Sequence, residues 1–79
     1  LEISFAEMAT RNKVHVNLNK SIGSIAAEMI TPYPPGVPFL MDGEIITREK
    51  VDYIKYMVGL GVKFHGGDLL KKDSILVYE

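Results

Sequence analysis

The clearest pattern of apolar and polar positions in the chain predicts one main helix over about residues 47–59. Thr47 is a favourable N-cap residue, and Glu49 places a negative charge in the first turn, where it complements the helix dipole. Gly59 or Gly61 can supply the left-handed residue that ends the helix. Charged side chains occupy the face opposite a row of apolar residues at helical spacing, which are Val51, Ile54, Met57 and Val58.

The first twenty residues predict a shorter helix and then a strand. Ser4 can cap a helix that runs to about Thr10, and Glu7 at the third helical position completes a capping-box spacing. Apolar residues then alternate with polar ones at 14, 16 and 18, which is typical of a half-buried strand, although so brief a segment also suits an extended lead-in. We expect a helical turn over residues 19–21, ended by Gly23.

Further apolar segments are predicted to be strands. Residues 25–30 mix isoleucine with alanine and suit a strand or a helix, but the following Thr31-Pro32 favours a strand, because a residue before proline is pushed into the extended region. Residues 37–41 resemble a second strand, closed by a turn at Asp42-Gly43. We expect extended residues over 62–64, a turn at 66–68 and a final strand over 75–78. The sequence therefore predicts a small single α+β domain with few short strands, one main helix and a proline-rich crossing at residues 31–38.

The proline segment, Thr31 to Pro38, is the most constrained part of the chain. Its four prolines fix φ and remove four backbone donors, so we expect it to lie outside regular sheet and to form a stiff crossing between two strands. A cis bond is compatible with Tyr33-Pro34, and Gly36 can supply a positive φ. A proline-rich ligand for an aromatic groove is the alternative interpretation, disfavoured because apolar segments flank the prolines on both sides.

Composition limits the class of protein. The chain has 79 residues, enough for one small domain that buries roughly 60% of its unfolded surface. It contains no cysteine, which excludes disulfides and thiolate metal sites and fits a reducing, cytoplasmic compartment. Hydrophobic residues reach 47% at a net charge of −1. Such a composition fits either a dense core or an apolar surface buried against a partner or a larger parent chain, and both interpretations stay open.

Other features exclude several partners. Apolar runs fall short of the ~18 residues that span a membrane, and there is no signal-peptide pattern. Acidic and basic residues are interspersed, so we expect no nucleic acid and no membrane as partner. The first residue is Leu1 rather than Met, which predicts an excised piece or a processed product.

Catalytic and metal-binding patterns are incomplete in this chain. His15 and His65 lack a second ligand at metal-binding spacing, the glycine pairs lack the context of a phosphate loop, and the serines have no neighbouring base. Three carboxylates, Glu28, Glu44 and Glu49, remain as candidates for a carboxylate pair. For Glu28, a buried reactive carboxylate and a solvated or lysine-paired one are both open; for Glu49, the capping role suffices.

Residues 23–47 contain an Ala-Glu-x-Ile lead-in, then Pro-Tyr-Pro-Pro-Gly-x-Pro, then Gly-Glu-x-Ile-Thr at the start of the main helix. This succession resembles the carboxy-terminal domain of the ornithine/lysine/arginine decarboxylases, and looser similarity covers most of residues 1–79. Asp42 stands where proline is commoner in the family pattern, a departure that affects the local turn.

The resemblance implies a function for the parent chain rather than for these residues. Family members use pyridoxal 5'-phosphate to decarboxylate basic amino acids to polyamine precursors, and the cofactor lysine lies in a large upstream domain. The resemblance thus implies no cofactor in this domain, a large pyridoxal-phosphate-binding domain as partner, and a parent that is a homo-oligomer, at least a dimer. The expected role is an accessory one in stability, assembly and the active-site entrance. A free-standing interaction module that uses the proline segment or an apolar surface is the alternative.

The candidate site residues are those of the family motif. We hypothesise that Glu28, Tyr33 and Glu44 form part of the rim of a substrate channel or dock on the large domain, since carboxylates on a rigid turn attract cationic substrates. The alternative is that they satisfy backbone groups around the prolines. The complete set of motif residues is Glu28, Pro32, Tyr33, Pro34, Pro35, Gly36, Pro38, Gly43 and Glu44.

Overall fold

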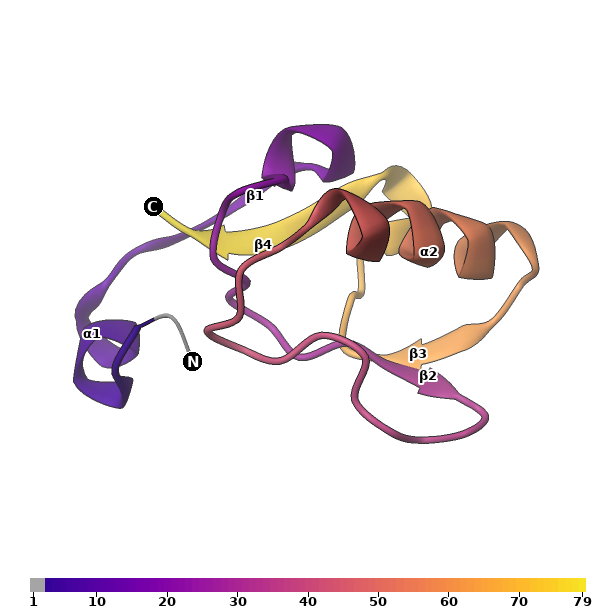
Figure 1. The fold of residues 1–79 in the computed structure, drawn as a ribbon, viewed down its shortest axis with the longest axis horizontal. Helices are drawn as coiled ribbons and strands as arrows, with labels where there is room; N and C mark the ends of the chain where they lie inside the picture. The colour runs from indigo at the N-terminus through magenta and orange to yellow at the C-terminus, as the bar shows by residue number, and fades with distance from the viewer. Residues whose placement is uncertain (1–2) are drawn as a thin grey trace.

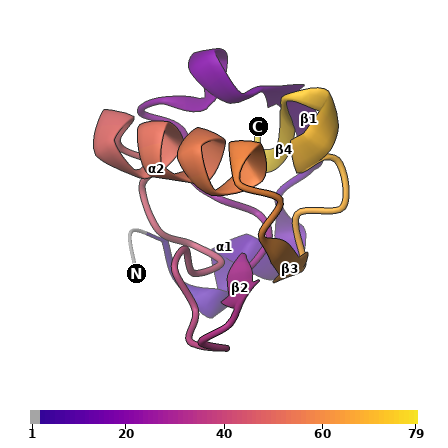
Figure 2. The same cartoon turned by 90° about the vertical axis from the view of Figure 1, so that its right-hand side faces the viewer.

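In the computed structural model, which describes residues 3–79, one long helix packs beside two small antiparallel sheets (Figure 1). The helices are α1 (Phe5–Thr10) and α2 (Arg48–Gly59), and there are also two 3₁₀ turns, η1 (Leu18–Ser21) after β1 and η2 (Leu70–Lys72) before β4. The strands are β1 (Lys13–Asn17), β2 (Thr31–Tyr33), β3 (Lys63–His65) and β4 (Ser74–Tyr78). The predicted α+β class is confirmed, and Figure 2 shows α2 above the β2–β3 pair and beside the β1–β4 pair.

Both predicted helices are confirmed together with their caps. The Ser4 hydroxyl accepts a hydrogen bond from the Glu7 backbone N–H at 3.1 Å, and the Glu7 carboxylate accepts from the Ser4 N–H, which completes the capping box. The Thr47 hydroxyl accepts from the Lys50 N–H at 3.2 Å at the start of α2. Beyond the end of α2, Gly61 takes the positive φ of +79° that the sequence assigned to Gly59 or Gly61.

The larger sheet joins distant parts of the chain. β1 pairs with β4 in antiparallel register from Lys13 opposite Tyr78 to Asn17 opposite Ser74. The Glu79 N–H donates to the Asn12 carbonyl at 2.9 Å, which extends the pairing by one bond. The predicted strands at residues 14–18 and 75–78 are therefore present, except that Leu18 already belongs to η1 and is fully buried there.

The predicted strands over residues 25–30 and 37–41 are wrong as regular strands. Each segment makes single bridges instead, at Ile25, Ala26 and Ile30 in the first and at Leu40 in the second. The physical reason is that residues 25–30 pass between two partners: the Ala26 N–H donates to the Glu44 carbonyl, whereas the Ala27 N–H donates to the Leu76 carbonyl. The backbone bends at Ala27 and Glu28, directly after the bridges of Ile25 and Ala26, so neither pairing extends into a ladder.

The prediction that the whole proline segment lies outside regular sheet is also wrong, since Pro32 lies within β2. β2 pairs with β3, with Pro32 opposite Phe64. The Pro32 carbonyl accepts a hydrogen bond from the Gly36 N–H at 2.8 Å, so this residue needs no ladder bond at its strand position. Beyond Tyr33 the segment leaves the sheet as expected. Both the Tyr33-Pro34 and Pro34-Pro35 bonds are cis, and Gly36 has the predicted positive φ.

The core lies between α2, β4 and the irregular segments that precede α2. One face of α2 contributes its buried residues to it, and a smaller cluster of Ile3, Ala27 and Tyr78 lies beneath α1. Buried members of the main cluster are Leu18, Ala26, Ile30, Leu40, Ile46, Val51, Ile54, Met57, Leu70, Ile75 and Val77.

Candidate functional site

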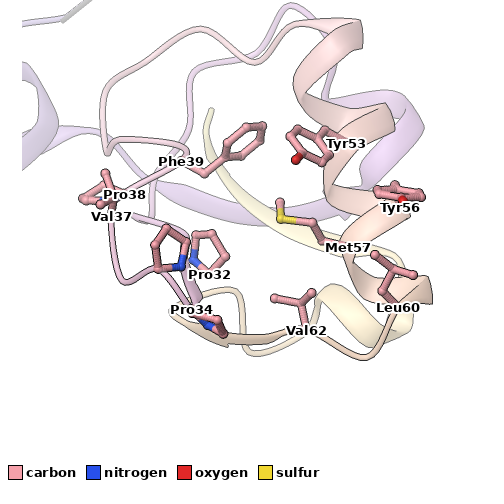
Figure 3. A pocket seen from close by; sticks show the side chains of 11 residues that line it. Pro32, Pro34, Val37, Pro38, Phe39, Tyr53, Tyr56, Met57, Leu60 and Val62 are labelled. Atoms are coloured by element: carbon pink, nitrogen blue, oxygen red, sulfur yellow. The ribbon is translucent and has the colours of Figure 1, made fainter.

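An apolar groove separates the proline segment from the carboxy-terminal half of α2 (Figure 3). Its volume is about 380 Å³, in the range of small-ligand and side-chain pockets. The described residues that line it are all apolar or aromatic: Pro32, Pro34, Pro35, Val37, Pro38, Phe39, Tyr53, Tyr56, Met57, Leu60 and Val62.

Helix α2 presents a second apolar row to this groove in addition to the one in the core. Tyr53, Tyr56 and Leu60 follow at intervals of three and four residues, so they share a face of the helix. Tyr56 is 61% exposed and Leu60 63% exposed, while the core row of the same helix is buried. A helix with two apolar rows is typical of one that packs on its own core and also contacts a partner.

The opposite wall is the proline segment, whose rings resist rearrangement because their φ angles are fixed. Val37 projects from it with 63% of its surface exposed. Phe39 packs edge-on against Tyr53, with ring centroids 5.2 Å apart, and the Lys50 ammonium lies 4.4 Å from the centre of the Phe39 ring. Rigid walls rich in tyrosine and proline can bind an apolar or aromatic side chain without a large cost in conformational entropy.

Tyr33 lies beside the groove rather than in its lining. Its ring packs edge-on against His65 on the neighbouring strand at a centroid distance of 4.7 Å, and 53% of the residue is exposed. Gly36 folds back over the same ring, where an added Cβ would come within 3.7 Å of it. Among the motif residues, Tyr33 therefore offers an aromatic surface and a hydroxyl to a neighbour.

Glu28 is held by backbone groups from two distant segments. One carboxylate oxygen accepts from the Gly67 N–H at 2.7 Å, and the other accepts from the Leu76 N–H at 2.8 Å. The carboxylate thus connects the turn before η2 to β4. The backbone packs closely at this turn, since a Cβ on Gly66 would overlap the Met29 carbonyl oxygen. Glu28 thus accepts from backbone donors, as the alternative interpretation expected, but these donors lie at Gly67 and Leu76 rather than around the prolines.

Glu44 is similarly engaged, at the turn that follows the proline segment. Its Oε1 accepts from the Met41 N–H at 2.9 Å, and its Oε2 lies 3.4 Å from the Lys50 ammonium. Lys50 also donates to the Phe39 carbonyl. Gly43 has the positive φ of +92° that the predicted Asp42-Gly43 turn needs. The structure therefore gives Glu28 and Glu44 separate partners and does not bring them together as a carboxylate pair.

The sequence reasoning missed a polar contact between Asp42 and Tyr78. The Tyr78 hydroxyl donates to the Asp42 carboxylate at 2.7 Å. Burial raises the pKa of Tyr78 to about 12, and the hydrogen bond to Asp42 adds to the effect. The Arg11 guanidinium and the Lys13 ammonium lie 5.9 and 5.6 Å from the centre of the same ring. The sequence offered Asp42 as part of the Asp42-Gly43 turn, but it gave no signal that Tyr78 is its partner.

Two further kinds of feature are absent from residues 3–79. No group of three or more histidine, cysteine or acidic residues is placed to hold a metal ion within that range. No helix among the described residues combines the length and apolar character needed to cross a bilayer.

Fold and sequence together define the class of protein. A sequence model described as "Orn/Lys/Arg decarboxylase, C-terminal domain" matches residues 2–67, and the chain belongs to that family. It is 36% identical over 66 residues to the protein YaaO of Bacillus subtilis (strain 168), a match covering 84% of this chain. It is 36% identical over 70 residues to the arginine decarboxylase of the same organism, covering 82% of this chain.

A solved structure supports the same assignment. The constitutive lysine decarboxylase of Escherichia coli superposes with a TM-score of 0.74 at 26% sequence identity, over 95% of this chain and 12% of that one. The chain spans 14% of the length of each Bacillus relative. The fold is therefore that of a small part of much longer proteins.

Proposed function

We propose that residues 1–79 are the accessory carboxy-terminal domain of a larger pyridoxal-phosphate-dependent decarboxylase of basic amino acids. In this proposal the domain supports stability, assembly and the active-site entrance of a cytoplasmic homo-oligomer in polyamine biosynthesis. The observation that carries it is the family match across residues 2–67 in a chain that spans 14% of its Bacillus relatives. The exposed apolar row of α2 supports a partner surface on such a domain.

The groove itself does not fit pyridoxal phosphate. The cofactor needs a lysine amine for its aldehyde and several donors for its phosphate. The lining residues are proline, aliphatic and aromatic, and the nearby Lys50 is already paired with Glu44 and the Phe39 carbonyl. In this proposal the cofactor is held by the larger part of the parent chain, and decarboxylation takes place there.

The rim hypothesis now rests mainly on Tyr33. Its exposed ring and hydroxyl are available to a neighbouring surface or to a substrate channel. On the same hypothesis Glu28 and Glu44 are positioning residues. Their carboxylates accept hydrogen bonds that hold the segments before and after the prolines in place. Tyr33→Phe and Tyr33→Ala in the full-length enzyme separate the two roles. Loss of kcat/KM with unchanged thermal stability supports the rim; lowered stability with unchanged kcat/KM contradicts it.

The alternative function is a free-standing interaction module. The groove supports this alternative, because its rigid aromatic and proline walls can bind a partner's side chain. The reading frame upstream of Leu1 distinguishes the two functions. Several hundred upstream residues with a cofactor lysine support the decarboxylase, whereas a start codon near Leu1 removes it.

The direct test measures decarboxylation. The full-length gene product is incubated with lysine, arginine and ornithine in turn, with and without added pyridoxal phosphate, and released carbon dioxide is quantified. We expect release from at least one of these substrates by the full-length protein. The 79-residue chain alone serves as control and should release none. Activity of the short chain alone, or inactivity of the cofactor-loaded full-length protein on all three, contradicts the proposal.

A further inference from the structure

A second apolar surface lies around α1, at the end of the molecule opposite the proline segment (Figure 1). This α1 hollow has a volume of about 520 Å³. It combines residues from α1, from the start of β1, from the segment before the prolines, from the turn after them, and from β4. Its lining residues are Phe5, Met8, Ala9, Lys13, Met29, Met41, Asp42 and Tyr78.

The apolar side chains of the α1 hollow are poorly covered. Phe5 is 77% exposed, and Met29 and Met41 are each 45% exposed. None of the six described residues of α1 is buried. A helix this short gains little from propensity alone and normally depends on packing. The surface that α1 shares with Met29 and Met41 is therefore incomplete by itself.

The edge of the hollow is polar. Asp42 and Tyr78 form their hydrogen bond there, and the Lys13 ammonium lies over the Tyr78 ring. An apolar centre with a paired polar rim is the usual anatomy of a protein–protein interface. Methionine suits such a centre because its flexible thioether adapts to the opposing surface.

We propose that the α1 hollow is the docking surface for the part of the same polypeptide that precedes this domain in a decarboxylase. The proposal rests on the proposed function. The matched family is described as a carboxy-terminal domain, and the chain spans 14% of the Bacillus relatives, so in such proteins most of the polypeptide precedes it. Phe5 comes three residues after the start of the matched segment, a distance of at most about 11 Å along the chain.

Because the preceding part of the polypeptide is covalently attached close to α1, we infer that it occupies the α1 hollow. A tethered surface is present at an effective concentration near the millimolar range, which favours contact with the adjoining domain over contact with a free partner. Figure 1 shows the proline segment at the far end of the long axis from α1, so the groove beside the prolines and the α1 hollow can be occupied independently. A second copy of this chain is the competing occupant.

Thiol labelling of the full-length protein tests the proposal. The 79-residue sequence contains no cysteine, so single substitutions introduce the one reactive thiol of this domain. The test variants are Phe5→Cys and Met41→Cys, and Lys71→Cys at an exposed position is the matched control. Labelling by iodoacetamide is followed by mass spectrometry of the peptide. We expect both test positions to react at least about tenfold more slowly than the control, at every protein concentration.

Labelling of Phe5→Cys and Met41→Cys at the control rate overturns the proposal. Protection that disappears on dilution to single chains also overturns it and assigns the hollow to a second copy. A Phe5→Asp variant is expected to increase protease cleavage between the domains, while Lys71→Asp at the exposed control position should not; the reverse result contradicts the assignment. The decarboxylation assay is independent of these measurements, so failure of the docking surface and failure of the proposed function are told apart.

Discussion

Replacing Glu28 by alanine should remove the connection between the turn before η2 and β4. The variant leaves two partly buried backbone donors, at Gly67 and Leu76, without their carboxylate acceptor. Hydrogen bonds to a charged group contribute about 1.5–3 kcal/mol each, and solvent can reach part of this site. We therefore expect Glu28→Ala to lower the free energy of unfolding by about 3 kcal/mol. A domain of this size has roughly 4–12 kcal/mol in total, so the loss is large.

Urea denaturation of the 79-residue chain, followed by far-UV circular dichroism, measures the effect. With a slope near 1 kcal/mol per molar urea, the midpoint should fall by about 3 M. Glu28→Gln keeps one acceptor oxygen and should fall between the wild type and Glu28→Ala. Glu49→Ala removes the same charge from an exposed helix position and should cost less than about 1 kcal/mol. If Glu28→Ala unfolds within about 0.5 kcal/mol of the wild type, the two hydrogen bonds do not stabilise the fold and our reasoning is refuted.

The remaining predictions concern a close approach, a titration and an ion pair. Gly66→Ala places a Cβ against the Met29 backbone and should lower the free energy of unfolding by about 3 kcal/mol or more. Gly61→Ala has a similar φ but open space around the Cβ, and it should lower the free energy of unfolding by about 1–2 kcal/mol. Equal losses of stability in thermal unfolding would contradict this difference. The pKa of Tyr78 is about 12 in the folded chain and about 10 when unfolded, so the protonated hydroxyl contributes its full stability below about pH 10. This contribution is lost as the pH rises from about 10 to 12. Tyr78→Phe should flatten this part of the curve of stability against pH. A double-mutant cycle of Glu44 and Lys50 should give a coupling of about 0.5–1 kcal/mol that falls at about 1 M salt, and a salt-independent value would exclude an ionic origin.

The helices and turns of this fold could be predicted from sequence because their signals are local. The Ser4–Glu7 capping box and the Thr47 cap each lie within three residues of the groups that they satisfy. The segments at 25–30 and 37–41 were misassigned because their shape depends on partners elsewhere in the chain. Apolar composition showed that residues 25–30 contribute to the core, but not that the backbone bends at Ala27 and Glu28 and bridges to three separate segments.

The candidate site was predicted in part. The proline segment was recognised as rigid and specific, since proline restricts the backbone whatever surrounds it. The facing wall was missed because Tyr53 and Tyr56 each adjoin a charged residue and Leu60 lies between two glycines, so their apolar row is not obvious in the sequence. Their spacing was a usable signal. The bonds of Glu28 to residues 39 and 48 positions away had no signal in the sequence.

The pairing of β1 with β4 also has a consequence for how the domain folds. The first strand finds its partner in the last strand of the domain, with Lys13 opposite Tyr78. Loop closure over such a separation is entropically costly, and contacts this distant in sequence slow folding. On a ribosome, β1 would emerge long before β4 is synthesised. The larger sheet therefore has to assemble after the whole domain has left the exit tunnel, and until then the apolar face of α2 lacks the contribution of β4 to the core.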